Sequence, residues 1–216
     1  MKRIHYSFIA VLLFITYGCE RNLTSEGVSK TTTYVVMTVT GDPFMSIAKG
    51  TPFTDPGVTA MEGDVSATVT TTGTVDSNTP GVYTLDYTAV NREGYSVSES
   101  RIVCVYDPSA AANNFEGSYA RSTNQSIAVW TKIAPGMYSV FNPGGAPGTN
   151  LTIHAFNATG NVIIVPTQKS SDGSITSCKN ATGGSDIIYN PGPPAKYAWV
   201  VVNAGYGAST RTFVKQ

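Results

Sequence analysis

The residues of this 216-residue chain that could do chemistry are few and far apart. After the first nineteen residues the chain has one histidine, His154, in the alternating segment 151–156. A catalytic triad needs a nucleophile, a base and an orienting group at one place, and no Gly-x-Ser-x-Gly elbow accompanies His154. We therefore expect His154 on the face of a sheet rather than in an active site.

Two further functions would use the carboxylates, namely glycoside hydrolysis and calcium binding. Glycoside hydrolysis needs two carboxylates about 5–10 Å apart, and residues 109–216 contain only Glu116, Asp172 and Asp186. Asp172 and Asp186 are in turn-like sequence, so we predict no catalytic residue and keep a hydrolase as the least favoured alternative.

A calcium ion requires several oxygen ligands at once. Four acidic residues cluster near predicted turns, namely Asp42, Asp55, Glu62 and Asp64. Their spacing matches no calcium loop, and no Cys/His cluster suggests another metal. Solvated turns are the favoured interpretation, so we predict no metal and no cofactor, with calcium binding left open.

Aromatic residues give the best binding signal. Flat rings with a polar edge can stack on sugars while nearby polar groups bond the hydroxyls. Trp130 alternates with Ala128 and Lys132, and we expect it on a solvent-facing side, whereas Trp199 has a more core-like setting. The candidate ligand-binding residues are Trp130, Tyr206, Tyr189 and Lys132. The alternative is that these rings fill the core.

The N-terminus predicts export. A basic head at Lys2 and Arg3 precedes an apolar run, Phe8–Ile15, that is too short to span a bilayer. The segment 1–18 resembles a bacterial lipoprotein signal peptide, which implies that Cys19 is lipidated. An ordinary signal peptide is the alternative. The polar residues 19–32 predict a flexible tether.

The charge is divided unevenly after signal removal. Twelve basic and fourteen acidic residues then remain, a balance with no general attraction for nucleic acid. Residues 31–107 carry nine acids and three bases, whereas residues 109–216 carry three acids and seven bases. These opposite charges weakly favour contact between the two regions.

The remaining cysteines are Cys104 and Cys178. Cys104 sits in an alternating apolar run, which favours a buried structural thiol. A Cys104–Cys178 bridge joining the two regions is the alternative, and two thiols cannot make a disulfide framework.

Residues 33–107 predict a β-sandwich. Turn signals recur every 8–12 residues between short β-branched strands. In segment 82–90, Tyr83, Leu85, Tyr87 and Ala89 share one face, as in a sheet with one buried side. The segments 50–60, 79–89 and 101–105 resemble those of a bacterial immunoglobulin-like domain, found in surface lipoproteins of Bacteroides-type bacteria. The resemblance implies an immunoglobulin-like sandwich over residues 33–107.

Residues 115–216 predict an antiparallel β-meander, either a small barrel or a curled sheet, after a proline-marked boundary at 107–114. The expected hairpins include segments 126–132 with 137–142 and 174–177 with 187–190. This region resembles the C-terminal domain that often follows the immunoglobulin-like one in Bacteroides lipoproteins. The predicted fold class is all-β.

Together these features predict a non-catalytic, lipid-anchored cell-envelope protein, in the outer membrane of the cell. Its partners would be the membrane, through the lipid, and a polysaccharide or an outer-membrane protein bound by the C-terminal domain, with the first domain as spacer. A purely structural component of an outer-membrane complex is the main alternative.

Overall fold

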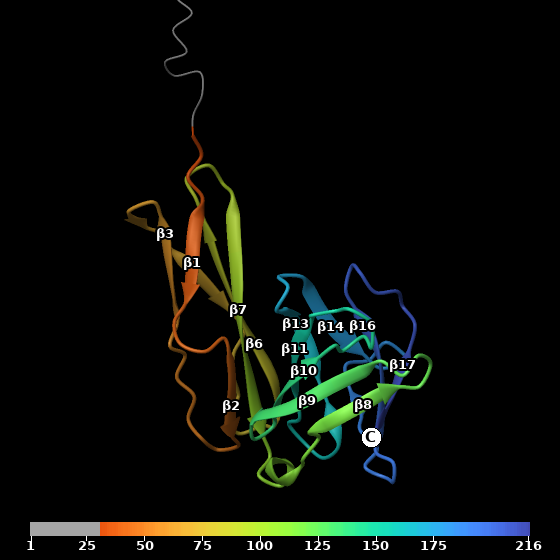
Figure 1. Cartoon of the computed structure of the whole chain (residues 1–216). Coiled ribbons are helices and arrows are strands. Elements are labelled where there is room, and N and C mark those ends of the chain that lie inside the picture. The colour runs from red at the N-terminus through yellow and green to blue at the C-terminus, as the bar shows by residue number, and fades with distance from the viewer. Residues whose placement is uncertain (1–30) are drawn as a thin grey trace, which may run out of the picture. The chain divides into compact units, whose positions relative to one another are not determined.

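Short strands joined by turns make up the part of the chain that the structure, a computed structural model, describes, which is residues 31–216 (Figure 1). The helical element within this range is one 3-10 turn, Ala110–Ala112. No helix in residues 31–216 is long and apolar enough to cross a membrane. The predicted signal peptide 1–18, the lipidation site Cys19 and most of the tether 19–32 lie outside the described residues. The all-β prediction is confirmed.

Two sheets form the N-terminal region, residues 33–107. The first has the strand order β1 (Val35–Val39), β3 (Val58–Glu62), β4 (Val65–Ser66). The second has the order β2 (Phe44–Ala48), β7 (Ser96–Tyr106), β6 (Gly81–Val90), β5 (Val69–Thr72). The alternation predicted for β6 is confirmed, because Leu85, Tyr87 and Ala89 are buried between the sheets. β-branched and aromatic residues on alternate positions favour this packing.

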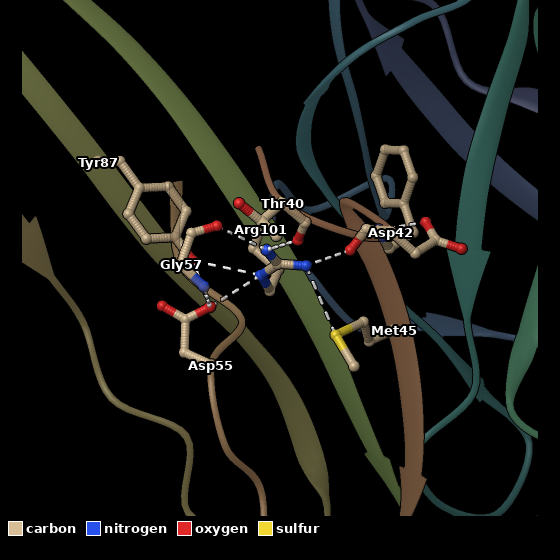
Figure 2. A network of polar contacts seen from close by, with 8 residues as sticks. Thr40, Asp42, Met45, Asp55, Gly57, Tyr87 and Arg101 are labelled. Atoms are coloured by element: carbon tan, nitrogen blue, oxygen red, sulfur yellow. Dashed lines mark hydrogen bonds and ion pairs between the residues drawn. The ribbon is translucent and has the colours of Figure 1, made fainter. Parts of the chain in front are cut away.

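A buried arginine ties the N-terminal region together (Figure 2). The Arg101 side chain is 0% exposed, and its Nε donates to Asp55 Oδ1 at 3.0 Å. Its Nη2 donates to the carbonyls of Thr40 at 2.7 Å and Gly57 at 3.2 Å, and its Nη1 donates to the Asp42 carbonyl. Every guanidinium nitrogen therefore has an acceptor, which is what a buried charge requires.

The segments that carry the immunoglobulin-like resemblance meet at this arginine. Asp55 comes from segment 50–60, Tyr87 from segment 79–89, and Arg101 from segment 101–105. Tyr87 donates its hydroxyl to Asp55 Oδ1 at 2.9 Å and accepts from Arg101 Nε at 3.2 Å. These three segments therefore bring together one polar cluster, whose contacts were not predicted from the sequence.

An eight-stranded antiparallel sheet forms the C-terminal region, residues 115–216. Its strand order is β11 (Thr152–Phe156), β10 (Met137–Phe141), β9 (Ile127–Ala134), β8 (Gly117–Arg121), β17 (Arg211–Lys215), β16 (Lys196–Val202), β14 (Ile175–Lys179), β13 (Val165–Lys169). A small sheet pairs β12 (Val162–Ile163) with β15 (Ile187–Ile188). The β9–β10 hairpin is confirmed. The predicted pairing of 174–177 with 187–190 is wrong, because β14 pairs with β13 and β16.

The two edge strands, β11 and β13, nearly close the sheet into a barrel. Phe156 and Ile164 exchange backbone hydrogen bonds of 2.9 and 2.8 Å. Beyond this bridge, Pro166 has no N–H to donate, and the Gln168 carboxamide takes over. Its Oε1 accepts from His154 N at 2.7 Å, and its Nε2 donates to His154 O at 2.8 Å. A side chain thus replaces the backbone pairing that the proline interrupts.

Aromatic side chains fill the space inside this curled sheet. Trp130, Tyr197, Trp199 and Phe213 pack ring against ring with centroids 4.7–6.2 Å apart, as aromatic pairs prefer. Their polar atoms are bonded internally: Trp130 Nε1 donates to the Tyr197 hydroxyl at 2.9 Å, and Trp199 Nε1 to the Pro143 carbonyl at 2.8 Å. An eight-stranded barrel is just wide enough for side chains to fill, so this interior is core.

The N-terminal and C-terminal regions share a second apolar cluster. Ile102 and Cys104 from β7 pack with Met137, Phe156 and Ala158. The ion pairs that the structure gives within residues 31–216, Arg92–Glu62 and Arg101–Asp55, both stay inside the N-terminal region. Apolar packing therefore stabilises this contact. Within the described residues no ion pair joins the two regions, so the predicted attraction of opposite charges is not seen as an ion pair.

Candidate functional site

A cleft lies between β6 and β7 on one side and β13 and β14 on the other. It consists of two adjoining hollows of about 250 and 230 Å³. Both hollows are lined by residues 99–100 of β7 and 168–169 of β13. The wider hollow extends along Asp86 and Ser98 towards Thr167 and Ile175, and the second extends to Phe44 and Ile102. Ligand pockets are commonly about 300 Å³ or more, so the two hollows together reach the size of a small-molecule site.

Strand alternation decides which side chains face the cleft. Asp86 and Ser100 are cross-strand partners in β6 and β7 and lie on one face of their sheet. Glu99 pairs with the buried Tyr87, so its side chain belongs to the opposite face. On the other wall, Thr167 and Lys169 are exposed, while Gln168 between them is buried. The cleft thus presents hydroxyls, one carboxylate and one ammonium group.

An aromatic stack forms the inner end of the cleft. The Phe44 ring lies on the His154 imidazole with centroids 3.9 Å apart and planes 22° apart. Burial lowers the pKa of His154, and the charge of Asp42 opposes this effect. A half-buried, neutral imidazole behind a phenyl ring acts as packing, and the prediction that His154 occupies a sheet face is confirmed.

The predicted ligand-binding residues do not come together at a surface. The expectation that Trp130 faces solvent is wrong, because its side chain is 3% exposed and points into the aromatic core. β9 is turned so that its β-branched side chains face outward and Trp130 inward. Tyr189 is also buried, and its hydroxyl is 3.0 Å from that of Tyr119. A direct ligand contact by these two rings stays an untested prediction.

Lys132 and Tyr206 lie at opposite ends of the eight-stranded sheet. Lys132 Nζ donates to the carbonyls of Ala111 at 2.9 Å and Asn113 at 2.8 Å, so it fastens the segment that precedes β8. Tyr206 is in the loop between β16 and β17, as its glycine-flanked sequence predicts, but its ring is half-buried because it packs against the aromatic core. The ring of Tyr206 lies 5.2 Å from Arg211 Cζ.

The two described cysteines are free and buried, so the alternative of a Cys104–Cys178 bridge is wrong. Burial raises the pKa of Cys104 to about 12 and also raises that of Cys178. Cys104 Sγ lies 3.6 Å from the Gly136 carbonyl, at the contact between the two regions. Thiols of this kind are unreactive, and Cys104 is the structural residue that its apolar run predicts.

Three of the four acidic residues considered for calcium have separate contacts. Asp55 pairs with Arg101, Asp42 Oδ1 accepts from Phe44 N at 2.9 Å, and Glu62 lies beside Arg92. Across residues 31–216, no three His, Cys, Asp or Glu side chains come together as a metal site would require.

An apolar stripe runs along the outer face of β9 and β10. Its four side chains are between 37% and 49% exposed, and they are Ile127, Val129, Ile133 and Phe141. Val129 and Phe141 are cross-strand partners. Contiguous exposed apolar surface often marks a site of protein contact. Placing Trp130 on the solvent-facing side implied that Ile127 and Val129 would face inward, and the structure reverses both.

The cleft could not be predicted from the sequence, because its walls come from segments that are about eighty residues apart in the chain. Asp86, Ser98, Thr167 and Lys169 are common polar residues in strands. Only the docking of the two regions brings them together. A usable signal was the polar face of β6, where Thr84, Asp86 and Thr88 alternate with the core residues.

The chain is similar to one family model and to solved structures of other proteins. Residues 37–105 match the family model described as a bacterial surface protein, Ig-like domain, which confirms the immunoglobulin-like fold expected there. No curated protein sequence matches the chain. Among solved structures, a lipoprotein of Bacteroides thetaiotaomicron is 24% identical, with 85% of this chain and 100% of that chain covered and a TM-score of 0.36. The CBM51-2 (in complex with GlcNAc) and INT domains of Clostridium perfringens ZmpB are 13% identical, with 84% and 43% covered and a TM-score of 0.30.

Proposed function

We propose that this chain is a non-catalytic, lipid-anchored protein of the bacterial cell envelope that binds a short glycan in the cleft between its two regions. The observation that carries the proposal is the cleft itself. It combines hydroxyl, carboxylate and ammonium side chains with the half-buried Phe44 at its inner end. Sugars need hydrogen-bonding groups for their hydroxyls and an apolar contact for their rings.

Placement at the cell envelope rests on the lipoprotein-like signal and Cys19, together with the bacterial surface family matched by residues 37–105. In this proposal the immunoglobulin-like domain is one wall of the binding site as well as a spacer. Binding without catalysis is supported by the carboxylates. Residue 99 borders the cleft, but Glu99 pairs with the buried Tyr87, so strand alternation directs its side chain to the face opposite that of Asp86. Two facing acids, as glycoside hydrolysis requires, are not assembled at this cleft.

A binding assay with a cleft variant tests the proposal. We expect soluble polysaccharides to retard the protein in affinity electrophoresis, and the double variant Asp86→Ala, Lys169→Ala to bind at least ~10-fold more weakly, since hydrogen bonds to charged groups contribute about 1.5–3 kcal/mol each. The matched control is Asp64→Ala, Lys196→Ala, which removes an exposed acid and an exposed base away from the cleft. No retardation across a broad panel, or equal retardation of both variants, contradicts the proposal.

A second candidate, a component that assembles with an outer-membrane protein, is favoured by the apolar stripe on β9 and β10. In that case the double variant Val129→Lys, Phe141→Lys should reduce the amount of a co-purifying outer-membrane protein ~10-fold or more, because two charges would face the apolar partner surface. Ile188→Lys is the control, since Ile188 is 64% exposed on the separate β15. Equal recovery with all three forms would rule out the stripe as an interface.

A further inference from the structure

Two arginines lie side by side at the end of the eight-stranded sheet where β8 ends and β17 begins. Arg121 is the backbone partner of Phe213, and Arg211 lies two residues before Phe213 on the same strand. Since alternate residues of a strand share a face, both arginines point to the same side as Phe213, which is fully buried in the aromatic core. This end is covered by the loops 122–126, 142–151 and 203–210.

The hydrogen bonding of this arginine pair is incomplete. Arg211 is 6% exposed. Its Nη1 donates to the carbonyls of Ser209 at 2.9 Å and Gly207 at 3.3 Å, and its Nη2 donates to the Gly207 carbonyl at 3.4 Å. Arg121 Nη1 makes only long contacts of 3.4 Å, to the carbonyls of Gly144 and Gly145. The Nε atoms of both arginines are buried and have no hydrogen-bond partner. Each such group in a folded protein calls for an explanation, such as a bound ion.

The charge of the pair is also unbalanced. No aspartate or glutamate occurs in loops 122–126, 142–151 or 203–210. The ion pairs given within residues 31–216 involve neither arginine. Burial and the neighbouring positive charge of Arg121 lower the pKa of Arg211. Buried charges are normally paired with opposite charges. Here two positive charges lie next to each other, and no carboxylate pairs with either of them.

We propose that Arg121 and Arg211 together bind one oxyanion, the carboxylate or sulfate group of an acidic ligand. Guanidinium groups match such anions because their parallel N–H donors make two hydrogen bonds at once. An anion between them would accept from the two unpaired Nε atoms and offset the positive charge of the pair. This site is separate from the cleft of the proposed function, and its charge selects acidic over neutral ligands.

The surrounding loops suit a covered anion site. The Tyr206 ring lies over the Arg211 guanidinium, and a Cβ on Gly144 would fall 2.0 Å from a Tyr206 ring carbon. Glycine at position 144 therefore lets the tyrosine close over the arginine. Gly205 and Gly207 flank Tyr206 and give its loop backbone freedom, so in this proposal the Tyr206 loop moves to admit the anion.

Thermal unfolding of the protein in sodium sulfate, against sodium chloride of equal ionic strength, tests the proposal. Ligand binding to the folded state alone should raise the melting temperature by about 3–6 °C at ten times the dissociation constant. Trp199 emission should change in parallel, because its indole donates to Pro143 in loop 142–151. Sodium glucuronate against glucose provides a second arm, which distinguishes a sugar acid from a free inorganic anion.

The variant Arg211→Gln should lose the sulfate-dependent rise, and Arg121→Gln should lose most of it. The control Arg92→Gln, whose side chain is 67% exposed, should keep the full rise. If Arg211→Gln does not fold, the test uses Arg121→Gln and Arg211→Lys instead. Arg211→Lys keeps the positive charge but loses the planar guanidinium group, so it should also lose the rise. The same melting temperature in sulfate and chloride, or an equal rise in the arginine variants, would overturn the proposal. The cleft variant Asp86→Ala, Lys169→Ala should keep the sulfate-dependent rise. The proposal for the arginine site and the proposal for the cleft can therefore be refuted separately.

Discussion

Replacing Asp55 with alanine is expected to lower the free energy of unfolding by about 3–5 kcal/mol, the range typical of removing one partner from a buried ion pair. The Arg101 side chain is 0% exposed and would keep its charge without the carboxylate that balances it. The Tyr87 hydroxyl would lose its acceptor as well. Urea denaturation followed by circular dichroism measures this change.

The double variant Asp55→Ala, Arg101→Met should be less destabilised than the sum of the two single variants, because it leaves no unpaired charge behind. Asp64→Ala, which removes an exposed acid, is the control and should change the free energy of unfolding by less than about 0.5 kcal/mol. If Asp55→Ala behaves like this control, the ion pair does not stabilise the immunoglobulin-like domain.

Replacing Trp130 with alanine is expected to destabilise the protein by about 3–5 kcal/mol, as large-to-small changes of buried aromatic residues do. Trp130 touches Tyr138, Tyr197 and Trp199 in the core. The cavity would remove all three contacts and leave the Tyr197 hydroxyl without its donor. Chemical denaturation gives the loss of stability directly.

The variant Trp130→Phe separates packing from hydrogen bonding, since it keeps a ring but removes the indole N–H, and a loss of about 1–2 kcal/mol is expected. At a temperature where both variants remain folded, glycan binding at the cleft should be unchanged. A Trp130→Ala protein that is as stable as the wild type but no longer binds glycan would restore Trp130 as a contact residue and refute its role in the core.

The presence of strands could be predicted, because hydrophobic periodicity depends only on residues that are close together in the chain. The alternation in β6 identified Leu85 and Tyr87 as core residues, and both are buried. The pairing of β14 was not predictable, because a pairing depends on the curvature of the whole sheet. The order of segments along the chain favoured a hairpin of β14 with segment 187–190. In the folded sheet, β14 instead lies between β13 and β16.

The candidate sites depended still more on tertiary structure. The outward and inward faces of β9 were assigned in reverse, because Trp130 and the β-branched Val129 are both acceptable core residues. Nothing within the strand itself decides between them. Packing decides, since the large indole fills the interior of the curled sheet and finds the Tyr197 hydroxyl there.

By itself the sequence determined the all-β class, the immunoglobulin-like motifs, the buried Cys104 and the loop position of Tyr206, because each follows from a residue and its near neighbours in the chain. Only the tertiary structure decided that Asp55, Tyr87 and Arg101 form one cluster, that β6 and β13 enclose a cleft, and that Arg121 and Arg211 lie together without an acid. These features join residues that are distant in sequence, and their contacts arise from the packing of sheets, which no local pattern specifies.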